Sequence, residues 1–202
     1  MAILLMHDFP SSTRSRRLRA AFALLLAPLL AARCANVPPW LERSYARVGP
    51  TLLTEHLAAD GTRDSGPFPG VGATVGTLLA VERTRSVGLE AEIEAFDLDP
   101  SDLDGYGFRY LGGARWHWNI DGRLRPTVGV GGSWTDFRFD DTRIGRDPGG
   151  AGGWVDCGLD WMITPWFGIG AKVRGLLRYE ESDREHGPRT GVELALQSVW
   201  RF

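Results

Sequence analysis

The side chains best suited to acid–base catalysis are the histidines, and the chain has only 4 of them in 202 residues. A serine hydrolase needs a serine, a histidine and an acid that converge in space. His117 is the best placed histidine, but the second residue after it is Asn119 rather than a serine. His56 has no obvious serine partner, and His186 lies in a polar stretch typical of a surface loop. We therefore expect no catalytic residues and interpret His117 as a charged interior residue.

Two other patterns could hold a metal ion or a phosphate group. Hard cations bind clustered oxygen ligands, but the acidic cluster of this chain lacks EF-hand spacing and is interrupted by Pro100. Its members are Asp97, Asp99, Asp102 and Asp104. The glycine-rich stretches 129–132 and 149–153 are not followed by a helix, as a phosphate-binding loop would be. The aspartates are typical of a solvated loop, so we expect neither a metal site nor a cofactor.

The elements that would position these side chains are strands, because apolar residues recur at every second position from about residue 44 onward. In the clearest case, 106–118, one face is aromatic or small and the other carries charged residues. The alternation covers eight segments: 44–56, 70–83, 87–95, 106–118, 124–138, 151–163, 165–179 and 191–202. Pro50 lies in the first segment and cannot donate a hydrogen bond to a neighbouring strand, so we expect a bulge at Gly49-Pro50.

The connections alternate in length. Short turns are expected at 84–86, 120–123 and 164–165, and longer polar loops at 57–69, 98–105, 139–150 and 180–189. Short turns on one rim and long loops on the other are typical of an outer-membrane barrel. A soluble ligand-binding barrel shows the same alternation turned inside out, but the charged, glycine-rich polar face does not suit an apolar ligand pocket. The sequence therefore predicts an all-β protein, a closed eight-stranded antiparallel up-and-down transmembrane barrel.

Aromatic residues gather near the ends of the predicted strands, where an apolar phase would meet water. The ten residue-to-residue steps from Phe108 to Trp118, at about 3.3 Å each and tilted by about 40°, cover about 25 Å, the height of the apolar band in such barrels. Phe96 also lies near the end of its segment, beside the long loops. The predicted girdle residues are Tyr106, Phe108, Trp116, Trp118, Trp134, Trp161, Phe167, Tyr179 and Trp200.

The N-terminus has the pattern of a cleavable export signal. Arginines precede a short apolar run at 20–32 and small residues follow, as a signal peptidase site needs. At about 13 residues the run is shorter than the roughly 20 that a membrane-spanning helix needs. Arg33 precedes Cys34, which argues against a lipoprotein signal. We assign residues 1–35 to a signal peptide with a long leader, 36–43 to a periplasmic lead-in and 44–202 to the barrel. Only Cys157 is certain to remain after cleavage, so no internal disulfide is expected.

In these features the chain resembles the small eight-stranded outer-membrane barrels, such as OmpX and the membrane domain of OmpA, over roughly residues 44–202. In that family a terminal phenylalanine with alternating apolar residues before it is read by the assembly machinery. Leu194, Leu196, Trp200 and Phe202 fit this signal, and Ser198 departs from it.

The resemblance implies a monomer integral to the outer membrane of a Gram-negative bacterium. Its partners would be lipopolysaccharide and other outer-membrane lipids, the assembly machinery and periplasmic chaperones. The lipid A deacylases among such barrels carry a serine where this chain has Asn119. A net charge of −2 gives no reason to expect nucleic-acid binding.

The interior of an eight-stranded barrel is just wide enough for side chains to fill, so the charged face predicts a network of paired charges in the lumen. Its predicted members are Glu82, Glu90, Glu92, Glu94, Arg109, Arg115, Asp156, Asp160, Lys172, Arg174, Arg178, Glu193 and Arg201, with Arg47 on the same face. The first expectation is a non-enzymatic envelope protein whose surface loops serve envelope integrity, adhesion or surface interaction. A narrow pore, with the acidic row 90–94 and the basic row 172–178 as opposite walls, and a lipid-modifying enzyme are the alternatives.

Overall fold

The computed structural model describes residues 43–55, 57–59, 62–64, 66–82, 84–98, 105–139, 149–181 and 186–202. The predicted export signal at 1–35 and all of the lead-in except Arg43 lie outside these residues, as do His56, Asp99, Asp102 and Asp104. Within the described residues, no helix is long and apolar enough to cross a membrane.

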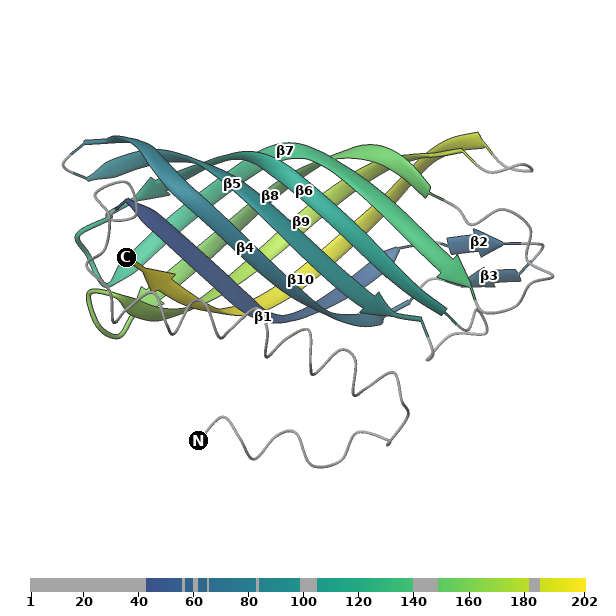
Figure 1. Ribbon diagram of the computed structural model, residues 1–202, viewed down its shortest axis with the longest axis horizontal. Helices are drawn as coiled ribbons and strands as arrows, with labels where there is room; N and C mark the ends of the chain where they lie inside the picture. Colours follow the sequence, from purple (N-terminus) through teal and green to yellow (C-terminus); the bar gives the residue numbers. More distant parts are fainter. Residues whose placement is uncertain are drawn as a thin grey trace, which may run out of the picture. The chain divides into compact units, whose positions relative to one another are not determined.

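Eight long strands close into one barrel (Figure 1). They are β1 (Ser44–Glu55), β4 (Phe68–Val81), β5 (Arg85–Asp97), β6 (Gly105–Trp118), β7 (Leu124–Phe139), β8 (Gly149–Met162), β9 (Phe167–Glu181) and β10 (His186–Arg201). The order around the barrel is β1-β10-β9-β8-β7-β6-β5-β4, and every neighbouring pair is antiparallel. Each strand thus pairs with the next long strand along the chain, and β10 returns to β1. The predicted closed, eight-stranded, up-and-down barrel is confirmed.

The connections follow the expected alternation with one exception. Short turns join β4 to β5, β6 to β7 and β8 to β9. The β4–β5 turn and the β6–β7 turn are linked by a hydrogen bond from the Asn119 amide to the Thr84 carbonyl at 2.6 Å. The connection from β1 to β4 contains a small hairpin that the sequence reasoning missed, β2 (Leu57–Ala59) with β3 (Thr62–Asp64). The expectation of a long loop at 180–189 is wrong, because β9 and β10 pair as far as Glu181 and His186.

Strand β1 passes Pro50 without the expected bulge. The register of β1 with β10 is the same before and after this point, from Val48↔Ser198 to Thr51↔Ala195, and the pairing with β4 continues through Pro50 itself. The Ser198 hydroxyl donates to the Val48 carbonyl at 3.0 Å, which satisfies one backbone acceptor beside the proline. The register shift lies instead in β4, between Leu78 and Ala80.

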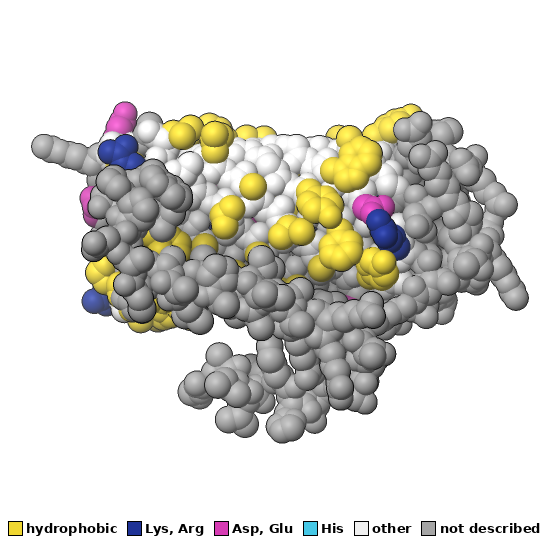
Figure 2. All heavy atoms as spheres, in the orientation of Figure 1, with side chains coloured by type: hydrophobic (Ala, Val, Ile, Leu, Met, Phe, Trp, Pro, Cys, Tyr) yellow, Lys and Arg dark blue, Asp and Glu magenta, His cyan; other side chains and the backbone are white. Residues whose placement is uncertain are grey.

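The outer face of the barrel is apolar. Along each strand the exposed residues alternate with buried ones, and many exposed ones are large hydrophobic side chains, such as Val75 (59% exposed), Leu159 (46%) and Leu194 (51%). Figure 2 shows hydrophobic side chains spread over one side of the barrel, with the visible charged groups toward its two ends. A surface of this kind would be costly in water and is stable in lipid.

The inner face carries the charges, together with an apolar cluster. Buried Leu53, Phe68, Phe96 and Phe137 belong to this cluster, which also includes Trp154. Phe96 lies near a strand end but is only 2% exposed, so it points into the barrel. It shares the face of Glu94, because residues two apart on a strand point to the same side.

Candidate functional site

Arg115 on β6 forms the most fully paired unit in the lumen. Its guanidinium donates to both oxygens of Glu90 on β5, at 2.7 and 2.8 Å, and to both oxygens of Asp156 on β8, at 2.8 and 2.7 Å. Strand β7 lies between β6 and β8 and presents Gly129 at this level, opposite both Arg115 and Asp156. The Cβ of any larger residue at Gly129 would lie 2.8 Å from the Asp156 carboxylate and 2.9 Å from the guanidinium. The absence of a side chain at Gly129 therefore leaves room for the Arg115 guanidinium to pass over β7 and reach Asp156 on β8.

Arg174 on β9 spans the lumen. Strands β5 and β9 are four places apart in the ring of eight, so they face each other across the barrel. Arg174 donates to Glu92 and, at 2.6 Å, to Glu94 on β5. Lys172, also on β9, donates to Glu92 at 2.6 Å. The acidic and basic rows do lie on opposite walls, but their side chains meet instead of leaving a passage between them.

A second bridge crosses the lumen at Arg109 on β6. It donates to Glu193 on β10, which is four places away in the ring, at 2.9 Å, and to Glu94 at 3.2 Å. Arg174 also reaches Glu193, at 3.2 Å. These side chains are no more than 1% exposed. Buried charges are stable only when paired and hydrogen-bonded, and here each carboxylate has more than one cationic partner.

Aromatic rings support the arginines. Arg109 lies over Phe96 at 4.8 Å from the ring centroid, and Arg174 lies over Trp154 at 5.0 Å. Arg178 lies over Phe137 at 5.1 Å. Guanidinium groups are attracted to the faces of aromatic rings, most strongly where water is excluded. The lumen is therefore filled by alternating charged and aromatic groups.

The structure gathers most, but not all, of the predicted network. Asp160 pairs with Arg47 at 2.8 Å, close to the short turns. Arg201 is half-buried near the same turns and donates to the Ile120 carbonyl at 3.2 Å rather than to a carboxylate. The prediction for Glu82 is wrong, since it is exposed in the turn after β4. The bulge at Leu79 shifts the alternation by one position, so Glu82 no longer continues the inner face of β4.

Sequence reasoning missed Glu55, Tyr45 and Arg125. Glu55 on β1 pairs with Arg178 at 2.8 Å and with Arg109 at 3.5 Å, and the Tyr45 hydroxyl donates to Glu90 at 3.0 Å. A signal was present: Tyr45 and Glu55 have the same odd numbering as Arg47 on the same strand, and unbroken alternation places them all inside.

The predicted girdle residues occupy outward-facing positions of their strands. Trp116, Trp134, Trp161 and Tyr179 are between 38% and 58% exposed. Phe167 and Trp200 contact each other at the short-turn rim, with ring centroids 4.8 Å apart. Leu194 and Leu196 of the proposed assembly signal also face outward, at 51% and 61% exposed.

Comparison with solved structures identifies the architecture. The chain superposes on Neisserial surface protein A with a TM-score of 0.57 and 13% identity, covering 79% of this chain and 97% of that one. It superposes on Ail, the attachment invasion locus protein of Yersinia pestis, with a TM-score of 0.54 and 17% identity, again covering 79% and 97%. The fold is that of the small eight-stranded outer-membrane barrels. No protein-family profile matches the sequence, and no curated protein matches it significantly.

As an outer-membrane-type barrel the chain is built inside out relative to a soluble protein. Its charges are collected in the lumen, and its large apolar side chains point outward. The resemblance drawn from the sequence is thereby confirmed at the level of the fold, which by itself does not define a function.

Proposed function

We propose that the protein is a non-enzymatic barrel of the bacterial outer membrane, exported by its N-terminal signal, with a lumen closed by paired charges. The observation that carries this proposal is the pair of cross-lumen bridges, Arg174 to Glu92 and Glu94, and Arg109 to Glu193. A hydrated ion would have to separate several buried ion pairs to pass. That cost argues for a structural or surface role over a transport role.

The same bridges allow a direct test by conductance in planar lipid bilayers. The refolded wild-type barrel should insert without single-channel events. The Arg109→Ser/Lys172→Ser/Arg174→Ser triple variant removes both bridges together with the Lys172–Glu92 ion pair and should conduct if it folds, whereas Arg138→Ser, at an exposed position, should remain silent. Regular channel openings by the wild-type protein would overturn the closed lumen and favour the narrow pore.

The orientation follows from the two rims. The start of β1 and the end of β10 both lie at the short-turn rim, where the Phe202 amide donates to the Ser44 carbonyl at 3.1 Å. In barrels of this type short turns face the periplasm and long loops face outward. An epitope inserted between Phe139 and Gly149 should therefore bind antibody on intact cells, and one inserted after Asp121 should bind only after permeabilisation. The reverse pattern would contradict the orientation.

The long loops would then carry the surface role, in envelope integrity, adhesion or surface interaction. Ail, whose name describes attachment and invasion, has the same barrel architecture, which supports this assignment. We also propose that the barrel is a monomer. Its partners would be lipopolysaccharide, other outer-membrane lipids, the assembly machinery and periplasmic chaperones. Loss of surface attachment in a variant lacking 140–148, with normal barrel assembly, is the expected result; unchanged attachment and envelope integrity would count against it.

The arrangement around His117 supports a non-enzymatic role. Ser86 is its cross-strand neighbour, but neither the Ser86 hydroxyl nor His117 Nε2 has a hydrogen-bond partner, so they do not bond to each other. Asp160, the acid nearest to them in the same pocket, is paired with Arg47. A nucleophilic serine needs a base within hydrogen-bond reach and an acid that orients the base. Unchanged lipid A in an overexpressing strain is the expected result, and modified lipid A would refute it.

A further inference from the structure

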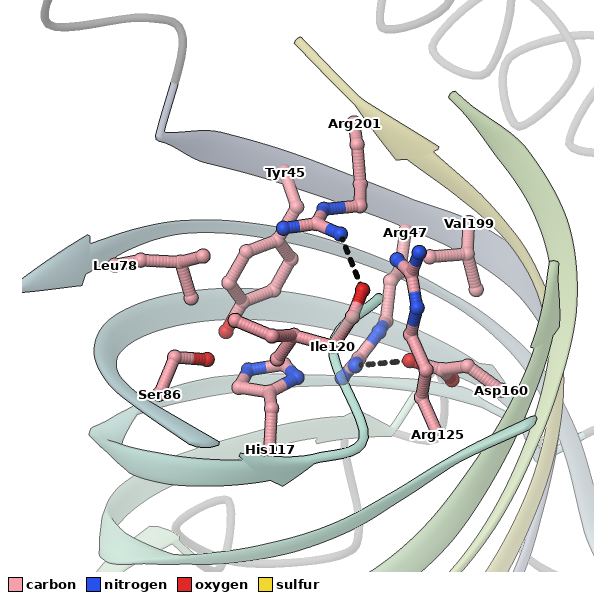
Figure 3. A pocket seen from close by; sticks show the side chains of 10 residues that line it. All are labelled: Tyr45, Arg47, Leu78, Ser86, His117, Ile120, Arg125, Asp160, Val199 and Arg201. Carbon is pink, nitrogen blue, oxygen red and sulfur yellow. Dashed lines mark hydrogen bonds and ion pairs between the residues drawn. The ribbon is translucent and has the colours of Figure 1, made fainter. Parts of the chain in front are cut away.

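The short-turn mouth of the barrel holds a small pocket with an excess of positive charge (Figure 3). Its cavity volume for a water-sized sphere is about 20 Å³, and the pocket is partly open to solvent. Arg47, Arg125 and Arg201 line it, and Asp160 is the one carboxylate among its lining residues. Asp160 is already bound by Arg47 at 2.8 Å.

Two of these arginines have no carboxylate partner among the described residues. Arg125 donates through Nε to the Gly122 carbonyl at 3.0 Å, and Arg201 donates through Nη1 to the Ile120 carbonyl at 3.2 Å. The two guanidinium groups lie near enough to repel each other, with Asp121 and Asp160 as the nearby acids that attract them. Figure 3 shows both side chains extending toward the Ile120 carbonyl from different strands. A positive field is thus concentrated at this mouth.

Unused hydrogen-bonding atoms line the same pocket. Arg47 Nε, the Ser86 hydroxyl and His117 Nε2 are buried and have no partner. The three side chains are 3%, 3% and 7% exposed. Ser86 and His117 are opposite each other on β5 and β6, so their polar atoms come from one place on the wall. A buried donor without an acceptor is unfavourable, and such groups in native proteins usually have a partner.

We propose that this pocket binds a phosphate-type oxyanion through Arg125, Arg201, His117 and Ser86. A water molecule could accept hydrogen bonds from the buried donors, but it carries no charge and leaves the two guanidinium groups repelling each other. An oxyanion supplies several acceptor oxygens and neutralises the guanidinium charges. Hydrogen bonds between guanidinium groups and oxyanions are also shorter and stronger than neutral ones.

The proposal is tested by titrating inorganic phosphate into the refolded barrel in a maltoside detergent, with chloride as the only other anion, by calorimetry. Saturable binding is expected. Arg125→Gln should weaken it by about tenfold or more, as loss of a charge-assisted hydrogen bond does. Arg123→Gln is the matched control, because Arg123 is exposed in the same turn and should leave the affinity unchanged.

Further measurements distinguish a loss of phosphate binding from a loss of folding. Each variant is first checked for the gel shift of a folded barrel. Ser86→Ala, a smaller change, should also weaken binding, and phosphate should shift the side-chain nitrogen resonance of His117 in the wild-type protein. Absence of saturable binding by the wild type, or an equal loss in Arg123→Gln, would overturn the proposal.

The source of the oxyanion is distinguished by competition. Dihexanoyl phosphatidic acid, used below its micelle concentration, presents the same chemistry on a lipid. Displacement of inorganic phosphate by lower concentrations of this lipid would identify a lipid headgroup as the occupant, and weaker competition would identify a free solute. Either result supports the site, and binding of neither probe would refute it.

Discussion

Replacing Arg115 measures the energetic role of the lumen network most directly. Its four contacts to Glu90 and Asp156 are 2.7 to 2.8 Å long, and the side chain is 1% exposed. Arg115→Met keeps much of the volume but leaves two buried carboxylates without the cation between them. Breaking a buried pair costs about 3–5 kcal/mol. Because Tyr45 still donates to Glu90 and Arg174 still reaches Asp156, we expect the lower half of that range.

The assay is urea unfolding of the barrel refolded in lipid vesicles, followed by tryptophan fluorescence and extrapolated linearly to zero urea. The triple variant Arg115→Met/Glu90→Gln/Asp156→Asn removes the stranded charges with the cation, so it should recover much of the loss. Arg138→Met, at an exposed position, should match the wild type. A loss for Arg115→Met below about 1 kcal/mol, as for exposed pairs, or a triple variant as unstable as the single one, would refute the reasoning.

Three further predictions concern the two faces and the last strand. Leu194→Arg places a charge on the apolar face and should cost about 2–4 kcal/mol in vesicle unfolding experiments; an unchanged free energy of unfolding would contradict the lipid-facing position of Leu194. Gly129→Ala should cost about 1–3 kcal/mol by overpacking, because its Cβ would lie 2.7 to 2.9 Å from three side-chain atoms. Gly132→Ala, whose Cβ would approach no atom closer than 3.8 Å, should be nearly neutral, and similar losses in both would exclude a steric cause. Deletion of Phe202 should slow the appearance of heat-modifiable barrel in the outer membrane, and normal assembly would refute the proposed signal.

Alternation along the sequence predicted which side of the wall most residues face, because a period of two is a local property of a strand. The positions of Glu90, Glu92 and Glu94 on the inner face of β5 follow from it directly. Glu82 was misplaced because one extra residue in β4, at Leu79, reverses the phase. A bulge of this kind leaves little trace in composition, and the sequence instead drew attention to Pro50.

The partners of the charges could not be predicted, because they depend on strand order and register rather than on local pattern. Arg174 binds Glu92 and Glu94 only because β5 and β9 face each other across the ring. Phe96 illustrates a different limit of the sequence, which concerns the aromatic residues. An aromatic ring near a strand end suits either the membrane girdle or the lumen, and the identity of the residue does not distinguish them. Only its alternation with Ala95 and Asp97 places the Phe96 ring on the inner face.

The central claim is that the chain closes into a barrel with its charges inside and its apolar face in lipid. It is tested most directly by the migration of the refolded chain on a gel, with and without boiling, after refolding in lipid vesicles and in plain buffer. A closed membrane barrel predicts a heat-dependent shift and a β-type circular dichroism spectrum in vesicles, with aggregation in buffer. A soluble, folded protein in plain buffer with no heat-dependent shift would contradict the account.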